Sequence, residues 1–267
     1  MKKFNLIILA GGKDGAWCES YGYKKKAMLP LLGKPTVSWV IEAFSRSDYI
    51  DNIIIIGPKE LRRLYSMRYV HRLLPEQASF MQNLFYAVFY IKASTYKFAR
   101  AHNGYLISFC DAAFLTTGVI NATLKTIAES DPGIALHYVQ KETIARNGYP
   151  IENRSYFHVC GKEYTGSNIY YVKKFSKLLK VFNDLRLLRG YRKEPQKILE
   201  HINYENEGIS GVEEALSKRL STALKIFISP FAEMGVDIDR GSDYEFAKAH
   251  FQKIKQQYAK SKDKKYF

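Results

Sequence analysis

The fold is decided by the stretch from Asn5 to Trp39, which reads NLIILAGGKDGAWCESYGYKKKAMLPLLGKPTVSW. Its apolar run Leu6–Ala10 predicts a fully buried strand. The strand ends at Gly11-Gly12, where the missing Cβ atoms let a phosphate or a base approach the main chain. A polar loop with the cationic run Lys24–Lys26 follows. The stretch therefore predicts a phosphate-binding turn followed by a poised lysine.

Apolar runs and helical patterns alternate from this stretch to about residue 140. Buried strands are predicted at Ile53–Ile56, Gly104–Cys110 and Gly133–Val139, with a short strand at Tyr69–Leu74. Helices are predicted at Val37–Phe44, Lys59–Met67, Ser79–Ile91 and Thr116–Glu129. This alternation specifies an α/β fold with a doubly wound, mostly parallel sheet, whose ligand site lies at the carboxyl ends of its strands.

The alternation breaks at Lys141. The segment from there to Val172 is rich in Gly, Asn and Tyr, and it predicts an excursion or antiparallel strands over the site, with alternating runs at Ser155–Cys160 and Asn168–Val172. Further elements are expected as helices near 173–188, 193–203 and 212–220, a returning strand at Ala223–Ile228, and a basic helix end or tail at 253–267. We expect one domain over 1–267, with an inserted subregion at 141–222.

Composition restricts the class of protein. The formal net charge of +15 indicates an anionic partner, but charge alone does not choose among nucleotides, phosphorylated small molecules, membranes and nucleic acids. The three cysteines include no C-x-x-C pair and fit a reducing compartment. No run of about 18 apolar residues predicts a membrane span, and the apolar run at the start is too short for a signal peptide. We expect a cytoplasmic protein.

The motifs LAGG and KAMLPLLGKP, with the helix that follows them, resemble the N-terminal signature of the MobA-like NTP transferase superfamily. Its relatives include sugar-1-phosphate, CMP-Kdo and methylerythritol-phosphate nucleotidyltransferases. The resemblance implies a Rossmann-like sheet of the GT-A type and a glycine-rich loop that wraps the nucleotide. It also implies that Lys26 neutralises the phosphates. The loop is longer than the family's usual G-G-x-G-x-R and lacks its arginine. In this respect the sequence resembles an uncharacterised bacterial subgroup of the family, in which the loop is extended.

Asp111 is the best single candidate for a metal ligand. It ends a predicted apolar strand at the functional edge of the sheet, where a carboxylate is well placed to hold Mg²⁺. The resemblance assigns the same role to it, although the family's D-x-P is replaced by Asp111-Ala112-Ala113. The alternative interpretation is that Asp111 caps the next helix from a distance.

The second metal ligand is expected in the segment GVDIDRGSD at 235–243, which resembles the family's D-x-D-x-P-x-D. Asp237 and Asp239 point to the same side of an extended segment, so either can bind. Alignment on Asp243, which is expected to cap the last helix, favours Asp239. Catalysis by Lys26, Asp111 and Asp239 is the resulting prediction.

The resemblance also suggests residues that bind the substrates. Nucleotide-binding residues are expected at Ala10, Gly11, Gly12, Lys13, Ser79 and Asn83. The F-T-G-G-N, R-[TS]-Y and R-K-x-P motifs of the bacterial subgroup imply acceptor-binding residues at Arg154, Thr165, Gly166, Asn168, Arg192 and Lys193, where arginine suits a phosphate. Helix capping or a place in the core is an equal alternative for Asn83, and a surface turn is the alternative for the acceptor motifs.

The function implied is transfer of an NMP group from an NTP to a phosphorylated sugar or polyol, with Mg²⁺ and release of pyrophosphate. A glycosyltransferase on the same sheet would normally carry D-x-D after the central strand, which Asp111-Ala112-Ala113 lacks. A nucleotide-sensing protein is the second alternative, favoured by the missing loop arginine and D-x-P proline. A nucleic-acid-binding module is supported by charge alone, so we expect no sequence-specific nucleic-acid partner.

Overall fold

The computed structural model of the chain describes residues 2–11, 16–94, 103–152, 154–174 and 208–260. Its centre is a sheet of nine strands within these ranges, in the order β5-β4-β1-β6-β10-β7-β9-β8, with β11 beside β7. The strands are β1 (Phe4–Leu9), β4 (Ile50–Ile56), β5 (Arg72–Leu74), β6 (Tyr105–Phe109), β7 (Ile134–Gln140), β8 (Phe157–Val159), β9 (Lys162–Gly166), β10 (Tyr170–Val172) and β11 (Leu224–Ser229).

The centre of the sheet is parallel and buried on both faces. β1 pairs in parallel with β4 and β6, so that Ile7 lies opposite Ile54 on one side and Ile107 on the other. Successive side chains alternate between the two faces, and those of Ile54 and Ile55 enter different hydrophobic clusters. Continuous β-branched runs fit such strands because neither face meets water.

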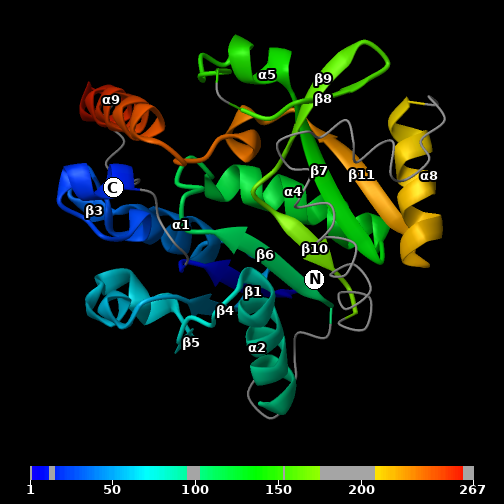
Figure 1. Cartoon of the computed structure of the whole chain (residues 1–267), viewed down its shortest axis with the longest axis horizontal. Coiled ribbons are helices and arrows are strands. Elements are labelled where there is room, and N and C mark those ends of the chain that lie inside the picture. The colour runs from blue at the N-terminus through cyan, green and yellow to red at the C-terminus, as the bar shows by residue number, and fades with distance from the viewer. Residues whose placement is uncertain (1, 12–15, 95–102, 153, 175–207, 261–267) are drawn as a thin grey trace.

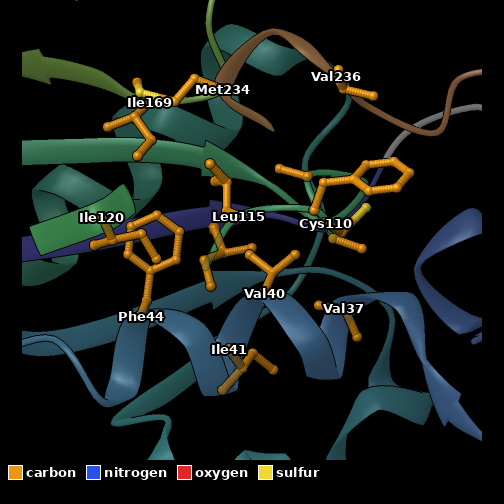
Figure 2. Close-up of a cluster of buried hydrophobic side chains, with 14 of the residues drawn as sticks. Val37, Val40, Ile41, Phe44, Cys110, Leu115, Ile120, Ile169, Met234 and Val236 are labelled. Atoms are coloured by element: carbon orange, nitrogen blue, oxygen red, sulfur yellow. The ribbon is translucent and has the colours of Figure 1, made fainter. Parts of the chain in front are cut away.

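Helices cover both faces of the sheet (Figure 1). One face packs against α1 (Thr36–Ser45), α4 (Thr117–Ser130) and α9 (Gly241–Lys260), and the other against α2 (Phe80–Ala93) and α8 (Gly208–Leu220). Figure 2 shows Val40 and Phe44 of α1 pointing toward Leu115 and Ile120. The doubly wound arrangement is confirmed. Among the described residues, no helix has both the length and the apolar character that a membrane crossing needs.

An antiparallel strand interrupts the parallel order. After β7 the chain forms α5 (Lys141–Arg146) and the hairpin of β8 and β9, and then returns as β10. β10 pairs antiparallel with both β6 and β7, and so it fills the place between two parallel strands. The predicted excursion with antiparallel strands is confirmed, and it is anchored to the centre of the sheet at both of its ends.

Some predicted elements differ from those observed. The helix predicted over Lys59–Met67 is wrong: two 3-10 turns, η3 (Lys59–Arg63) and η4 (Tyr65–Tyr69), replace it, because Leu64 between them has extended backbone at φ −77° and ψ 137°. The strand predicted over Tyr69–Leu74 is shorter in the structure, where it is β5 (Arg72–Leu74). Strand β9 was not predicted. The helices expected near 173–188 and 193–203 lie outside the described residues, apart from positions 173 and 174.

Candidate active site

The candidate site lies at the carboxyl end of β6, beside the end of β1. Asp111 lies two residues beyond the end of β6, and the segment that joins the 3-10 turn η5 (Ala232–Gly235) to α9 passes the same end of the sheet (Figure 1). The backbone N–H of Ile238 donates to the Asp111 carbonyl oxygen at 3.2 Å and holds the segment there. Open α/β sheets bind ligands at this edge, so the two predicted carboxylate segments meet where a ligand is expected.

Three carboxylates gather at this edge. One ligand atom from each of Asp111, Asp237 and Asp239 lies within 4.8 Å of the others. Asp111 is only 6% exposed, and its Oδ1 has no hydrogen-bond partner among the residues that the structure describes. A buried carboxylate oxygen without a partner is costly unless a cation completes it. The oxygen donors therefore fit a hard divalent cation.

The ammonium group of Lys26, from the 3-10 turn η2 (Lys26–Met28), lies between two of these carboxylates. Its Nζ contacts Asp111 Oδ2 and lies 2.7 Å from Asp239 Oδ1. Burial alone would lower the pKa of Lys26, but the negative charge of Asp111, with Cys110 and Asp239, raises that pKa above its usual range. The lysine therefore remains charged, and the structure brings the three residues predicted for catalysis together.

Burial also disfavours charge on the carboxylates. It raises the pKa of Asp111, and Lys26 opposes the rise. It raises the pKa of Asp237 to about 7, where Asp111 and Asp239 add repulsion and Arg154 offsets part of it. Asp111 and Asp237 both resist ionisation, and Asp239 adds a third carboxylate beside them, so one more cation would stabilise the cluster. This is the electrostatic reason that the cluster suits a divalent metal ion.

Arg154 lies against the carboxylate cluster. Its Nη1 donates to Asp237 Oδ1 and to the Gly235 carbonyl oxygen, both at 2.8 Å, and its Nε donates to the Pro150 carbonyl oxygen at 3.2 Å. The side chain is 9% exposed. The sequence suggested that Arg154 binds an acceptor phosphate, whereas the structure gives its guanidinium protein partners on the segment that carries Asp237.

The glycine turn after β1 faces the loop between β5 and α2. Ala10 and Gly11 are described, while Gly12 and Lys13 lie outside the described residues. A Cβ on Gly11 would lie 2.3 Å from Glu76 Oε1, so this carboxylate rests directly on the bare backbone. Lys25 Nζ lies 3.2 Å from the same oxygen. Glu76 was not predicted as a site residue. The signal for it was its position just after a short predicted strand that ends at the functional edge of the sheet.

Two predicted nucleotide-binding residues shape that loop. Ser79 caps α2, since its Oγ accepts from the Gln82 N–H at 3.2 Å. Asn83 is buried, and its Oδ1 accepts from the Gln77 N–H at 2.6 Å. Ser79 is therefore the helix cap that the sequence predicts, and Asn83 holds the loop backbone beside Glu76.

Apart from Arg154, the predicted acceptor residues divide into three groups. Asn168 is buried and anchors the carboxylate segment, because its N–H donates to the Met234 carbonyl oxygen at 2.8 Å and its Nδ2 to that of Val236 at 3.0 Å. Gly166 pairs with β7 at the exposed end of β9, and Thr165 packs near Gly235. Arg192 and Lys193 lie outside the described residues.

Asp243 closes the site from the side of α9. Its Oδ2 accepts from the backbone N–H groups of Asp239 at 3.1 Å and Arg240 at 2.9 Å. An acidic side chain in the first turn that reaches back to the preceding N–H groups is half of a capping box. The prediction that Asp243 caps the last helix is confirmed, and the cap also fixes the backbone of Asp239.

Comparison with known proteins connects this geometry to a family. A family model described as the MobA-like NTP transferase domain matches residues 6–145, which include the glycine turn, Lys26 and Asp111. Among curated proteins there is no match.

Several solved structures share the fold. A hypothetical transferase from Thermus thermophilus is 24% identical, with a TM-score of 0.69 over 90% of this chain and 99% of that chain. A 4-diphosphocytidyl-2C-methyl-D-erythritol synthase from Anaerococcus prevotii is 12% identical, with a TM-score of 0.56 over 94% and 99%. A CMP:2-keto-3-deoxy-manno-octonic acid synthetase complexed with CTP is 11% identical, with a TM-score of 0.52 over 95% and 100%. At such identities these likenesses concern the fold alone.

Proposed function

The chain belongs to the MobA-like NTP transferase family and is a nucleotidyltransferase, and from this premise we propose its reaction. It transfers an NMP group from an NTP to a phosphorylated small molecule of the sugar or polyol phosphate type. Pyrophosphate leaves, and the reaction requires Mg²⁺. The odd number of cysteines fits a reducing compartment and supports a cytoplasmic location.

The observation that carries the proposal is the contact of Lys26 with Asp111 and Asp239. Phosphoryl transfer needs positioning and charge neutralisation more than covalent chemistry. A lysine that follows the glycine turn and a cluster of carboxylates supply both signs of charge in one place. In this proposal Lys26 neutralises the phosphates of the bound NTP, and it contributes most as charge builds on the departing pyrophosphate.

Asp111 and Asp239 would hold Mg²⁺, with Asp237 as the third carboxylate of the cluster. The support is the unpartnered Oδ1 of Asp111 and the clustering of the three acids. Bound Mg²⁺ would supply a positive charge that polarises the triphosphate and stabilises the leaving group. Two hydrogen bonds within the chain orient the backbone that carries these carboxylates. Asp243 Oδ2 accepts from the Asp239 N–H, and the Ile238 N–H donates to the Asp111 carbonyl oxygen.

The substrate-binding residues are part of the same proposal. Ala10, Gly11, Gly12 and Lys13 would receive the nucleotide at the glycine turn, beside the loop that Ser79 and Asn83 shape. The acceptor would bind over the excursion, where Thr165 and Asn168 contact the segment that leads to the carboxylates and Gly166 lies between them in the chain. Arg192 and Lys193 would be cationic candidates. Arg154 would need to leave Asp237 to bind an acceptor phosphate, so we give it a different role below.

Pyrophosphate release tests the proposal directly. The full chain is incubated with Mg²⁺ and each of the four common NTPs in turn, against a panel of sugar and polyol phosphates. We expect release with at least one pair, and loss of that release in Asp111→Asn. Tight NTP binding without pyrophosphate release from any member of a broad panel would contradict the reaction and favour a nucleotide sensor.

A further inference from the structure

Arg154 joins two parts of the chain that are distant in sequence. It belongs to the excursion after α5, and the segment that it contacts lies beyond β11. Its Nε bonds its own loop at Pro150, while Nη1 reaches Gly235 and Asp237, and Nη2 lies 3.4 Å from the Asp237 carbonyl oxygen. All three guanidinium nitrogens therefore have partners, and two of them hold Asp237 or its neighbouring backbone.

The geometry of these contacts uses what is particular to arginine. Its planar group carries donors in a fixed fork, which can hold a carboxylate and nearby carbonyl oxygens at once, whereas lysine acts as a point charge. With 9% of the side chain exposed, the pair with Asp237 is not a surface ion pair held loosely in water. Such a buried contact restricts where the carboxylate can go.

Asp237 needs such a restraint. Its ligand atom lies within 4.8 Å of those of Asp111 and Asp239, and like charges at this spacing repel. Lys26 contacts the latter two carboxylates, and Arg154 contacts Asp237. The two cations therefore divide the three acids between them.

We propose that Arg154 is a positioning residue that holds the Asp237 carboxylate beside Asp111 and Asp239, so that all three acids face one divalent cation. The inference rests on the proposed function, since it concerns the metal site of that reaction. It gives the excursion a second task besides acceptor binding, because a residue of the excursion then controls the geometry of the metal site.

Mn²⁺ binding to the full chain tests this role without any acceptor. Free Mn²⁺ is measured by its electron paramagnetic resonance signal during titration of the unmodified protein, Arg154→Ala, Arg154→Lys, Asp237→Asn and the double variant Arg154→Ala/Asp237→Asn. Arg146→Ala, an exposed arginine at the end of α5, is the matched control. Thermal unfolding identifies any variant that fails to fold. If Arg154→Ala does not fold, Arg154→Lys still tests the role, because it removes the fork of donors and keeps the positive charge.

If Arg154 positions the Asp237 carboxylate, its replacement should lower the affinity for Mn²⁺. Both Arg154 variants should bind Mn²⁺ roughly 10- to 100-fold more weakly, the cost usual for residues that orient a metal ligand. Asp237→Asn should weaken binding to a similar degree, and the double variant should be no weaker than Asp237→Asn, since both changes act through one carboxylate. Arg146→Ala should bind as the unmodified chain does.

Other outcomes overturn the inference in distinguishable ways. Removing a nearby cation that had no positioning role would strengthen Mn²⁺ binding by simple electrostatics, so tighter or unchanged binding in Arg154→Ala refutes positioning while the metal site stands. Additive losses in the double variant show that Arg154 does not act through Asp237. Failure of the unmodified chain to bind Mn²⁺, with or without NTP, refutes both the inference and the metal site of the proposed function.

Discussion

Lys26 and Asp239 lie 213 positions apart in the sequence, yet the lysine Nζ is 2.7 Å from the Asp239 carboxylate. The contact joins the loop after the first strand to the segment before the last helix. It also places a cation inside a cluster of acids, because the same Nζ contacts Asp111. Substrate phosphates and a metal ion that bind here would therefore compete with these ion pairs.

Lys26→Ala should depress both kcat and NTP affinity. The interaction strengthens as charge develops on the leaving pyrophosphate, so kcat should fall roughly a hundredfold. Steady-state kinetics with the productive NTP and acceptor, beside calorimetric titration with NTP and Mg²⁺, measures both effects. Lys24→Ala is the matched control, since Lys24 belongs to the same lysine run and is exposed. A variant that changed only the acceptor KM would contradict the role of Lys26.

Asp111→Asn should abolish metal-dependent turnover while the fold survives. Asparagine keeps the shape but removes the charge that would bind Mg²⁺, which should cost several kcal/mol of transition-state stabilisation, roughly a thousandfold in rate. Burial raises the pKa of Asp111, so its charge is disfavoured in the folded state, and Lys26 keeps Asp239 as a partner after the change. The thermal midpoint should therefore stay close to that of the unmodified protein. Asp48→Asn, at an exposed position, is the control. Near-native rates with Mg²⁺ would exclude Asp111 as a metal ligand.

The sequence predicts the parallel centre of the sheet and three residues at its carboxyl edge, Lys26, Asp111 and Asp239. Leu6–Ala10 and Gly104–Cys110 are continuous apolar runs, and such runs in an alternating α/β pattern allow few topologies. The rule that ligands bind at the carboxyl ends of the strands then predicts that Asp111 and the glycine turn lie at the same edge. The structure brings Lys26 to the same place, while the catalytic roles of these residues stay predictions.

The remaining contacts depend on tertiary structure that no local pattern encodes. Arg154 and Asp237 are 83 positions apart, and nothing in the spacing of either one names the other as its partner. The approach of Glu76 to Gly11 requires two loops to meet across the edge of the sheet. β9 went unpredicted because its sequence KEYTG has little β-branched or alternating apolar character, and pairing with β7 decides its conformation.

Gly235→Ala should destabilise the fold and displace the carboxylate segment. A Cβ there would lie 3.1 Å from Thr165 Cγ2 and 3.2 Å from both Ile144 Cδ1 and Val139 Cβ, so three elements would have to yield at once. Overpacking of this kind costs about 1–3 kcal/mol, which denaturant unfolding measures. Gly118→Ala is the control, because its nearest neighbour is 3.9 Å away and alanine suits a helix. Equal stability of both variants would contradict the crowding at Gly235.

Acid should destabilise the chain through His137. Burial on β7 lowers the pKa of His137 to about 4, whereas the unfolded chain binds this proton near its usual pKa of 6.5. Since the unfolded state holds the proton more tightly, this stability is fully present above pH 6.5 and is lost as the pH falls toward 4. At about 1.4 kcal/mol per pH unit, the loss is about 3 kcal/mol.

Denaturant unfolding from about pH 7.5 to about pH 4.5 checks this dependence. His137→Gln should flatten the decline in unfolding free energy between these limits, whatever its effect on stability at neutral pH. His158→Gln is the control, since the His158 side chain is 63% exposed. An unchanged slope in His137→Gln would show that other groups cause the acid sensitivity.

The place of β10 between β6 and β7 sets an order for folding during synthesis. Both neighbours leave the ribosome before β10 does, so a gap one strand wide stays open until residues 170–172 arrive. Until then the apolar edge of β6 is an unpaired template for other chains, a recognised hazard for aggregation. The family match ends at residue 145. A fragment cut at that boundary would contain the glycine turn, Lys26 and Asp111 but not the strand that closes the sheet, and we expect it to aggregate.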